Sequence, residues 1–196
     1  MKIITWPDLL KEKDQSFFEK GTAVSVGSFD GPHRGHFAIF RQVLSFAEKN
    51  GTLSGLVTFE KPLSSIKEGS FYKGDISTLQ ERLEIFGKIG FDFVLVIHFD
   101  EKFRQIEGKD FFSILKEKLN LKFIAEGEDF HCGHNGSFAK PQIQAFCAEN
   151  KISSLFVALV KENGKRISST LIRELIAEKN IAEADDLLGK TGGDSF

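Results

Sequence analysis

The sequence has little of what several classes of protein need. It contains two cysteines in 196 residues, Cys132 and Cys147, which are too few for a disulfide framework in a chain of this size. It has no excess of positive charge either, because 26 Lys and Arg residues stand against 28 Asp and Glu residues, a formal net charge of −2. A nucleic-acid binder usually carries a basic balance or a basic stripe, so nucleic acid is not expected as a partner.

Long apolar runs are missing as well. No run approaches the roughly 18–20 apolar residues that a bilayer-spanning helix requires. The first twenty residues lack the apolar centre of a signal peptide, because Trp6-Pro7-Asp8 interrupts them and Lys11-Glu12-Lys13-Asp14 follows. We therefore expect a cytoplasmic protein with no membrane partner and unpaired cysteines. No protein partner is implied.

Short apolar strands alternate with helical patterns along most of the chain. A strand at 24–26, a glycine-rich loop, a helix at 36–50 and a strand at 56–59 make a βαβ unit. Further strands are expected at 93–97, 123–125 and 155–160, and further helices at 79–89, 111–119, 141–150, 169–179 and 181–188. Strands this apolar need helices on both faces, so we predict one α/β domain with a doubly wound parallel sheet.

In such a sheet the ligand lies beyond the carboxyl ends of the strands. The loops to search are those at 27–36, 60–72, 126–140 and 161–170. They hold most of the unusual residues.

The first of these loops has the physical features of a phosphate site. It reads Gly27-Ser28-Phe29-Asp30-Gly31-Pro32-His33-Arg34-Gly35-His36. Its glycines let the backbone approach a ligand, and the helix that begins near Gly35 directs unpaired N–H groups and a positive dipole end toward it. His33 and His36 are three residues apart across the helix start, so both imidazoles can donate hydrogen bonds to one group of phosphate oxygens.

Other interpretations of the two histidines stay open. A His pair at this spacing is also an ordinary feature of a surface or a core. The pair could bind zinc together with His131, Cys132 and His134, although that segment lacks the C-x₂-C or H-x₃-H spacing of structural zinc sites, and we predict no metal ligands. Dinucleotide binding is disfavoured, because no G-x-G-x-x-G is present.

A second motif lies near the end of the chain. It reads Arg166-Ile167-Ser168-Ser169-Thr170-Leu171-Ile172-Arg173 and follows a bend at Gly164-Lys165. Three hydroxyl residues at a helix start are common as an N-cap. Capping uses only one hydroxyl, however, and three hydroxyls with free N–H groups and a forked guanidinium suit a triphosphate tail.

Together the two motifs resemble those of bacterial FAD synthetases, the adenylyltransferase half of the bifunctional riboflavin kinase/FAD synthetase family. The first resembles the family's G-x-F-D-G-x-H-x-G-H, and the second resembles its R-[IV]-S-S-T-x-I-R. Other family landmarks occur in order as Thr58-Phe59-Glu60, Gly90-Phe91-Asp92, Gly127-Glu128-Asp129-Phe130 and Leu187-Leu188-Gly189. The resemblance covers about residues 24–189. It implies a Rossmann-like doubly wound sheet of the H-x-G-H nucleotidyltransferase superfamily.

The resemblance also implies an activity, which is transfer of the adenylyl group of ATP, accompanied by Mg²⁺, to FMN to give FAD and pyrophosphate. The implied catalytic residues are His33, His36 and Arg173. The implied ATP-binding residues are Gly27, Ser28, Phe29, Asp30, Gly35, Arg166, Ser168, Ser169 and Thr170. The implied flavin contacts are Phe59, Asp129 and Phe130.

Two segments depart from the family pattern. The usual T-F-E-P-H-P is Thr58-Phe59-Glu60-Lys61-Pro62-Leu63 here, and the usual D-F-R-F-G is Asp129-Phe130-His131-Cys132-Gly133. The family uses both segments around the flavin, so contacts on that side are expected to differ. A transferase with another phosphorylated acceptor and a non-catalytic flavin or nucleotide sensor are the alternative functions. We expect one adenylyltransferase domain over residues 1–189 and a short tail over residues 190–196, without a riboflavin kinase domain.

Overall fold

The computed structural model describes residues 1–62, 74–162 and 164–190. Leu63, most of the expected search loop at 60–72 and most of the expected tail at 190–196 lie outside these ranges. Within them, no helix combines the length and the apolar character that crossing a membrane would demand.

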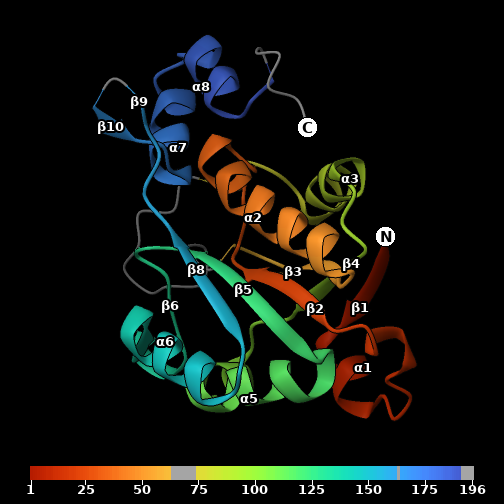
Figure 1. The fold of residues 1–196 in the computed structure, drawn as a ribbon. Coiled ribbons are helices and arrows are strands. Elements are labelled where there is room, and N and C mark those ends of the chain that lie inside the picture. Colours follow the sequence, from red (N-terminus) through yellow and green to blue (C-terminus); the bar gives the residue numbers. More distant parts are fainter. Residues whose placement is uncertain (63–73, 163, 191–196) are drawn as a thin grey trace.

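One sheet of parallel strands forms the centre of the described fold (Figure 1). Each pair of neighbouring strands runs parallel. Across the sheet the order is β1 (Lys2–Thr5), β4 (Phe93–Ile97), β3 (Leu53–Phe59), β2 (Thr22–Val26), β5 (Leu121–Gly127) and β8 (Ser153–Val157). The central strands β2, β3 and β4 are buried along almost their whole length, as strands covered on both faces must be.

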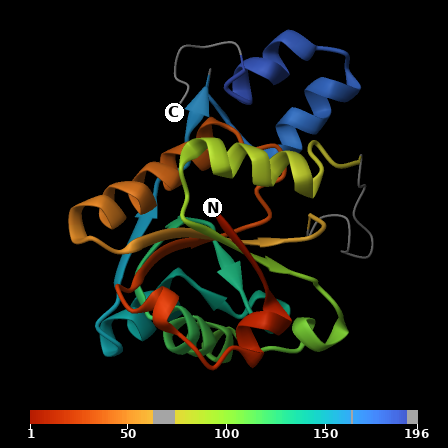
Figure 2. The same cartoon turned by 90° about the vertical axis from the view of Figure 1, so that its right-hand side faces the viewer.

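Helices cover both faces of this sheet (Figures 1 and 2). On one face α2 (Arg34–Asn50) and α3 (Leu79–Ile89) pack through side chains such as Phe40, which meets the strand residue Leu56 in one apolar cluster. The opposite face is covered by α1 (Trp6–Lys11), α5 (Gly108–Leu119) and α6 (Lys140–Glu149). The three layers confirm the predicted α/β class and the doubly wound sheet.

Two helices lie outside the three layers. α7 (Ser169–Ala177) and α8 (Ile181–Leu187) pack on each other around a small apolar cluster, beside the beginning of α2 (Figure 1). The shorter elements are η1 (Ser16–Phe18), α4 (Glu101–Arg104), β6 (His131–Cys132), η3 (His134–Gly136), β7 (Phe138–Ala139), β9 (Lys161–Glu162) and β10 (Lys165–Arg166).

The strand order fixes where a ligand can enter. From β2 the chain moves through β3 to β4 on one side, and it then returns to β5 and β8 on the other side. The order therefore reverses between β2 and β5. In doubly wound sheets the crevice for a ligand opens at this reversal, beyond the carboxyl ends of the strands.

Local sequence signals set the ends of the helices that frame this crevice. α3 begins with a capping box in which Thr78 and Glu81 each accept a backbone N–H of the other residue. α2 ends at Gly51, whose φ of 65° places it in the left-handed region that favours glycine. These signals explain why the expected helix at 79–89 matches the observed one and why the expected end of α2 is also correct.

Sequence reasoning overlooked β1 at the edge of the sheet. Its four residues are mostly exposed, so they carry no clear apolar pattern. They form a strand because they pair with β4, from Lys2 opposite Phe93 to Thr5 opposite Val96. The strand expected at 155–160 is β8, which ends at Val157.

Candidate active site

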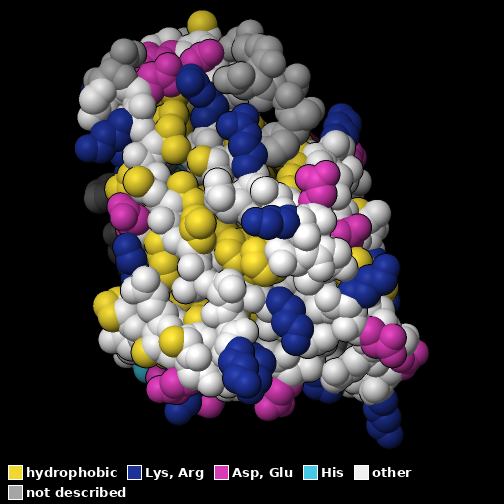
Figure 3. Space-filling model, in the orientation of Figure 1, with side chains coloured by type: hydrophobic (Ala, Val, Ile, Leu, Met, Phe, Trp, Pro, Cys, Tyr) yellow, Lys and Arg dark blue, Asp and Glu magenta, His cyan; other side chains and the backbone are white. Residues whose placement is uncertain are grey.

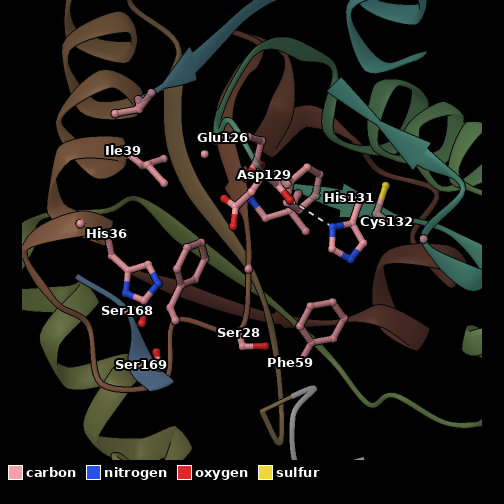
Figure 4. A pocket seen from close by; sticks show the side chains of 18 of the residues that line it. Ser28, His36, Ile39, Phe59, Glu126, Asp129, His131, Cys132, Ser168 and Ser169 are labelled. Atoms are coloured by element: carbon pink, nitrogen blue, oxygen red, sulfur yellow. Dashed lines mark hydrogen bonds between the residues drawn. The ribbon is translucent and has the colours of Figure 1, made fainter. Parts of the chain in front are cut away.

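A cavity of about 730 Å³ lies beyond the carboxyl ends of β2, β5 and β8. Its wall comes from the loop after β2, the start of α2, the segment after β5 and the start of α7 (Figure 4). Most of the predicted site residues line it: Gly27, Ser28, Phe29, His33, Gly35, His36, Phe59, Asp129, Phe130, Arg166, Ser168, Ser169 and Thr170. Asp30 and Arg173 are not among the lining residues.

The two histidines of the first motif form a reciprocal cap at the start of α2. The His36 N–H donates to His33 Nδ1 over 3.3 Å, and the His33 N–H donates to His36 Nδ1 over 3.4 Å. Their rings are stacked with centroids 3.7 Å apart, and Phe29 meets the His36 ring edge-on. Because each Nδ1 accepts a hydrogen bond, the proton of each neutral ring is on Nε2.

Burial keeps both imidazoles uncharged. It lowers the pKa of His33 to about 4, with the positive charge of Arg166 as the second cause. Burial also lowers the pKa of His36 well below its ordinary value, and the neighbouring His33 and Arg166 add to the effect. At neutral pH each ring is therefore a neutral Nε2–H donor on the wall of the cavity.

The second motif starts α7, and its hydroxyl groups have separate contacts. The Ser168 hydroxyl accepts the N–H of Leu171 over 3.2 Å, so the N-cap interpretation is confirmed for this residue. The Ser169 hydroxyl donates to the carbonyl of Asp30 over 2.8 Å, which ties α7 to the first loop. Thr170 lines the cavity beside them. The amino ends of α2 and α7 thus meet at one cavity.

Asp30 and Arg173 form a buried ion pair that braces the first loop. Asp30 also accepts the N–H of Ser77 over 2.9 Å, and Arg173 Nε donates to the carbonyl of Gly74 over 2.9 Å. The pair thereby links the first loop, α7 and residues 74–77. The structure places both residues in this brace, and their predicted contacts with the nucleotide stay predictions.

An ion pair joins two sides of the cavity mouth. Arg166 Nη2 lies 2.5 Å from Asp129 Oδ2, and both side chains are about half exposed. Arg166 belongs to the second motif, while Asp129 follows β5 and was predicted on the flavin side. The pair therefore connects the two predicted halves of the site.

One surface of the molecule carries basic side chains beside a band of apolar ones. Figure 3 shows them near the place where α2, β8 and α7 meet.

The end of the cavity away from the starts of α2 and α7 is aromatic and apolar. It includes the predicted flavin contacts Phe59 and Phe130. Sequence analysis missed the other apolar residues there, which are Phe99, Phe103, Ile106 and Phe111. They come from the turn after β4, from α4 and from the start of α5, and their Phe and Ile side chains resemble ordinary core residues in a chain with 21 Phe. No local signal could have marked them.

Glu126 is a further residue that sequence analysis missed. It lies near the end of β5, is 2% exposed and lines the cavity (Figure 4). Its Oε1 accepts the N–H of Val26 over 2.7 Å. Burial raises the pKa of this carboxyl well above its usual range, against the lowering effect of that hydrogen bond.

The residues His131, Cys132 and His134, which follow β5, do not form a metal site with the His33–His36 pair. His131 Nδ1 lies 3.0 Å from the carbonyl of Asp129, and His134 Nδ1 lies 3.2 Å from the carbonyl of Arg104. Over residues 1–62, 74–162 and 164–190, no three His, Cys, Asp or Glu side chains come together in a way that could hold a metal ion. The zinc interpretation thus gains no support from the described residues.

Comparison with known proteins identifies the family. A family model described as FAD synthetase matches residues 15–171, which is most of the chain. The chain belongs to the FAD synthetase family. The resemblance to this family seen in the two sequence motifs is thereby confirmed.

Relatives of this FAD synthetase family member differ in length. A bifunctional riboflavin kinase/FMN adenylyltransferase of Escherichia coli K12 is 30% identical over 174 residues, which cover 87% of this chain and 55% of that protein. A putative bifunctional riboflavin kinase/FMN adenylyltransferase of Geobacillus thermodenitrificans is 32% identical over 178 residues, which cover 91% of this chain and 95% of that protein. The chain thus spans about half the length of the Escherichia coli relative.

A solved structure also has this fold. The crystal structure of a macrolide-efflux protein from Streptococcus pneumoniae matches with a TM-score of 0.78 and 25% identity, over 96% of this chain and 60% of that one. The match confirms that the described sheet and helices are an arrangement seen in a solved structure.

Proposed function

We propose that this chain transfers the adenylyl group of ATP to FMN, giving FAD and pyrophosphate. One observation carries the proposal. The amino ends of α2 and α7, with the His33–His36 pair and three hydroxyl residues, face one end of a cavity whose other end is aromatic. A triphosphate fits the first end and the flavin ring fits the second.

The reaction needs positioning more than covalent chemistry. An oxygen of the FMN phosphate attacks the α-phosphorus of ATP and forms the new P–O bond. The bond from the α-phosphorus to the bridging oxygen of the β-phosphate breaks, and the electron pair leaves with pyrophosphate. A phosphate monoester is largely ionised at neutral pH, so the attacking oxygen needs no general base. Catalysis then consists of holding the two substrates in line and stabilising the developing charge.

The described residues supply neutral and charged donors for that purpose. His33 and His36 offer Nε2–H groups at the start of α2, where the helix dipole favours an anion. At the start of α7, backbone N–H groups near Ser169 and Thr170 face the same end of the cavity. We assign the α-phosphate to the histidines and the β- and γ-phosphates to the α7 end, with Arg166 alongside. Donors fixed before the reaction stabilise the transition state without reorganising.

Magnesium enters this proposal as part of the substrate. MgATP and FMN are small molecules, and the proposal requires no other partner. Phosphorylated nucleotides do not cross membranes unaided, so we also propose that the reaction takes place in the cytoplasm, where ATP is made available. The flavin ring is assigned to the end with Phe59, Asp129 and Phe130.

The test is an assay with MgATP and FMN in which FAD is separated by chromatography and pyrophosphate is measured. We expect both products in equal amounts. His36→Ala should lower turnover on the order of 10²-fold or more, because it removes one preorganised donor at the developing charge. His98→Ala is the matched control, since His98 is 73% exposed, pairs with Glu60 and does not line the cavity.

Two results would contradict the proposal. Consumption of ATP with another phosphorylated acceptor but never with FMN would show that the acceptor is wrong. Near wild-type turnover of His36→Ala would show that the histidines act only as the cap of α2.

A further inference from the structure

Glu126 is a buried carboxyl group that the proposed phosphate chemistry does not use. It lies near the end of β5, at the reversal of strand order, and is 2% exposed. It lines the same cavity as the substrate-binding residues (Figure 4). Burying an acidic side chain costs free energy unless it is hydrogen-bonded, so a ligand or a structural partner is expected for Glu126.

The carboxyl group replaces part of the hydrogen-bond ladder between two strands. The residue pairing between β2 and β5 ends with Val24 opposite Ile124. Beyond it, the Val26 N–H donates to Glu126 Oε1 over 2.7 Å. Glu126 Oε2 is left with a long contact of 3.5 Å to the Ser25 hydroxyl. One oxygen is therefore firmly used by the protein, and the second is available for a stronger hydrogen bond to a ligand.

The surroundings favour the neutral acid. Among the ion pairs of the described residues, none includes Glu126. Burial without a cation raises the pKa of Glu126 well above its usual range, which favours the protonated acid over the carboxylate. A protonated Oε2 can donate a hydrogen bond, which a carboxylate cannot.

We propose that Glu126 selects the flavin substrate by donating a hydrogen bond from Oε2 to a carbonyl oxygen of the pyrimidine-dione edge of the isoalloxazine ring. This inference rests on the proposed function. The dione edge carries two carbonyl oxygens beside an N–H, whereas adenine has no carbonyl group. The apolar end of the cavity, with Phe103 and Phe111, suits the rest of a tricyclic ring. Glu126 is thus a specificity residue for FMN.

The first measurement is FMN binding without ATP, followed by flavin fluorescence, in the full chain and two variants. Glu126→Gln keeps an acceptor for the Val26 N–H and an N–H donor for the flavin, so binding should stay within about threefold of the wild type. Glu126→Met keeps the length but removes both groups, so binding should weaken roughly 10-fold or more. The bound flavin should also lose, in Glu126→Met only, the absorbance shift that a hydrogen bond to its carbonyl produces.

The KM for ATP separates a specificity role from a structural one. Both variants should leave this KM within about twofold, because the proposed hydrogen bond from Glu126 goes to the flavin and not to the nucleotide. The matched controls are Glu128→Gln and Glu128→Met, since Glu128 is exposed, pairs with Lys140 over 3.6 Å and does not line the cavity. Both should bind FMN like the wild type.

Several outcomes would overturn the inference. FMN affinity unchanged in Glu126→Met would show that the flavin does not contact the acid. Parallel losses for ATP and FMN would show that Glu126 only holds β2 in place, and a selective loss for ATP would show that it contacts adenine. A Glu126→Gln variant as weak as Glu126→Met would show that Glu126 acts as a charge. Failure of the wild type to bind FMN would instead contradict the proposed function itself.

Discussion

At the scale of single residues, His33 and His36 have one observed role, as the cap of α2, and one proposed role, as phosphate donors, and the two share one geometry. Their Nδ1 atoms cap the first turn of α2, and this leaves the Nε2–H groups unused by the cap in two residues that line the cavity. The structural and the phosphate interpretations of the pair are therefore compatible. The cap fixes the two rings, and fixed rings would be preorganised donors for a phosphate.

The lowered pKa of His33 predicts how stability depends on pH. The unfolded chain takes up a proton on His33 near pH 6.5, whereas the folded chain does so only at about pH 4. Between these values the unfolded state binds more protons, so the free energy of unfolding should fall as the pH drops from about 6.5 toward 4. His33→Asn keeps an acceptor for the His36 N–H but cannot titrate, so its stability should fall less steeply.

Urea unfolding of both proteins between pH 4 and pH 7 measures this difference. The two slopes should differ by up to about 1.4 kcal/mol per pH unit, the value for one proton. Equal slopes would mean that His33 titrates in the folded protein as it does in the unfolded chain.

At the scale of elements, three segments far apart in the sequence meet around one ion pair. Asp30 and Arg173 hold the first loop against α7, and Arg173 also fixes the carbonyl of Gly74. A second buried arginine supports the same loop, because Arg82 of α3 donates to the carbonyls of Ser28, Phe59 and Glu60. Both arginines fix backbone carbonyls, and an arginine fork is suited to such a task because its N–H groups have fixed directions.

Arg173→Lys should separate a bracing role from a direct contact with phosphate. Lysine can pair with Asp30 but cannot also donate to Gly74, so the free energy of unfolding should fall by about 1 kcal/mol, the typical net value of one hydrogen bond. The KM for ATP should rise as well, because the first loop is less well fixed. Urea unfolding and initial rates at varied ATP measure the two effects, with Arg41→Lys on the exposed side of α2 as control.

In Arg173→Lys, a higher KM for ATP with an unchanged free energy of unfolding would show that Arg173 leaves Asp30 to contact the nucleotide, as the sequence predicted. Unchanged values of both would contradict the bracing role.

Features that depend on neighbouring residues could be predicted from the sequence, whereas features that depend on the fold could not. Apolar periodicity and capping residues predicted α3 and β4 with their observed ends, because those signals are local. Most of the site residues that the motifs predicted do line the cavity, because glycines, histidines and hydroxyls at two helix starts in one sheet are carried to the same edge. The Asp30–Arg173 pair could not be predicted, since its partners are 143 residues apart and only the fold brings them together. Glu126 was missed for a related reason, because one acidic residue in a strand has no pattern.

At the scale of the whole molecule, the cavity divides between two kinds of wall. The polar end is built by the starts of α2 and α7, and the apolar end by the segments that follow β4 and β5. The two ends meet at the Arg166–Asp129 pair, where the second motif contacts the segment after β5. This division predicts that MgATP and FMN each protect a different part of the chain from hydrogen exchange.

Hydrogen exchange measured with one substrate at a time tests this division. MgATP alone should slow exchange most in residues 27–36 and 166–171, and FMN alone should slow it most in residues 99–111 and 126–136. At about 100 times its dissociation constant, either ligand stabilises the native state by ~2.7 kcal/mol, which is enough to slow exchange by local opening measurably. α3 lines no part of the cavity and is the internal reference. Strongest protection by FMN at the starts of α2 and α7, with none after β4 and β5, would show that the aromatic end is not the flavin site, because a phosphate monoester alone would account for that pattern.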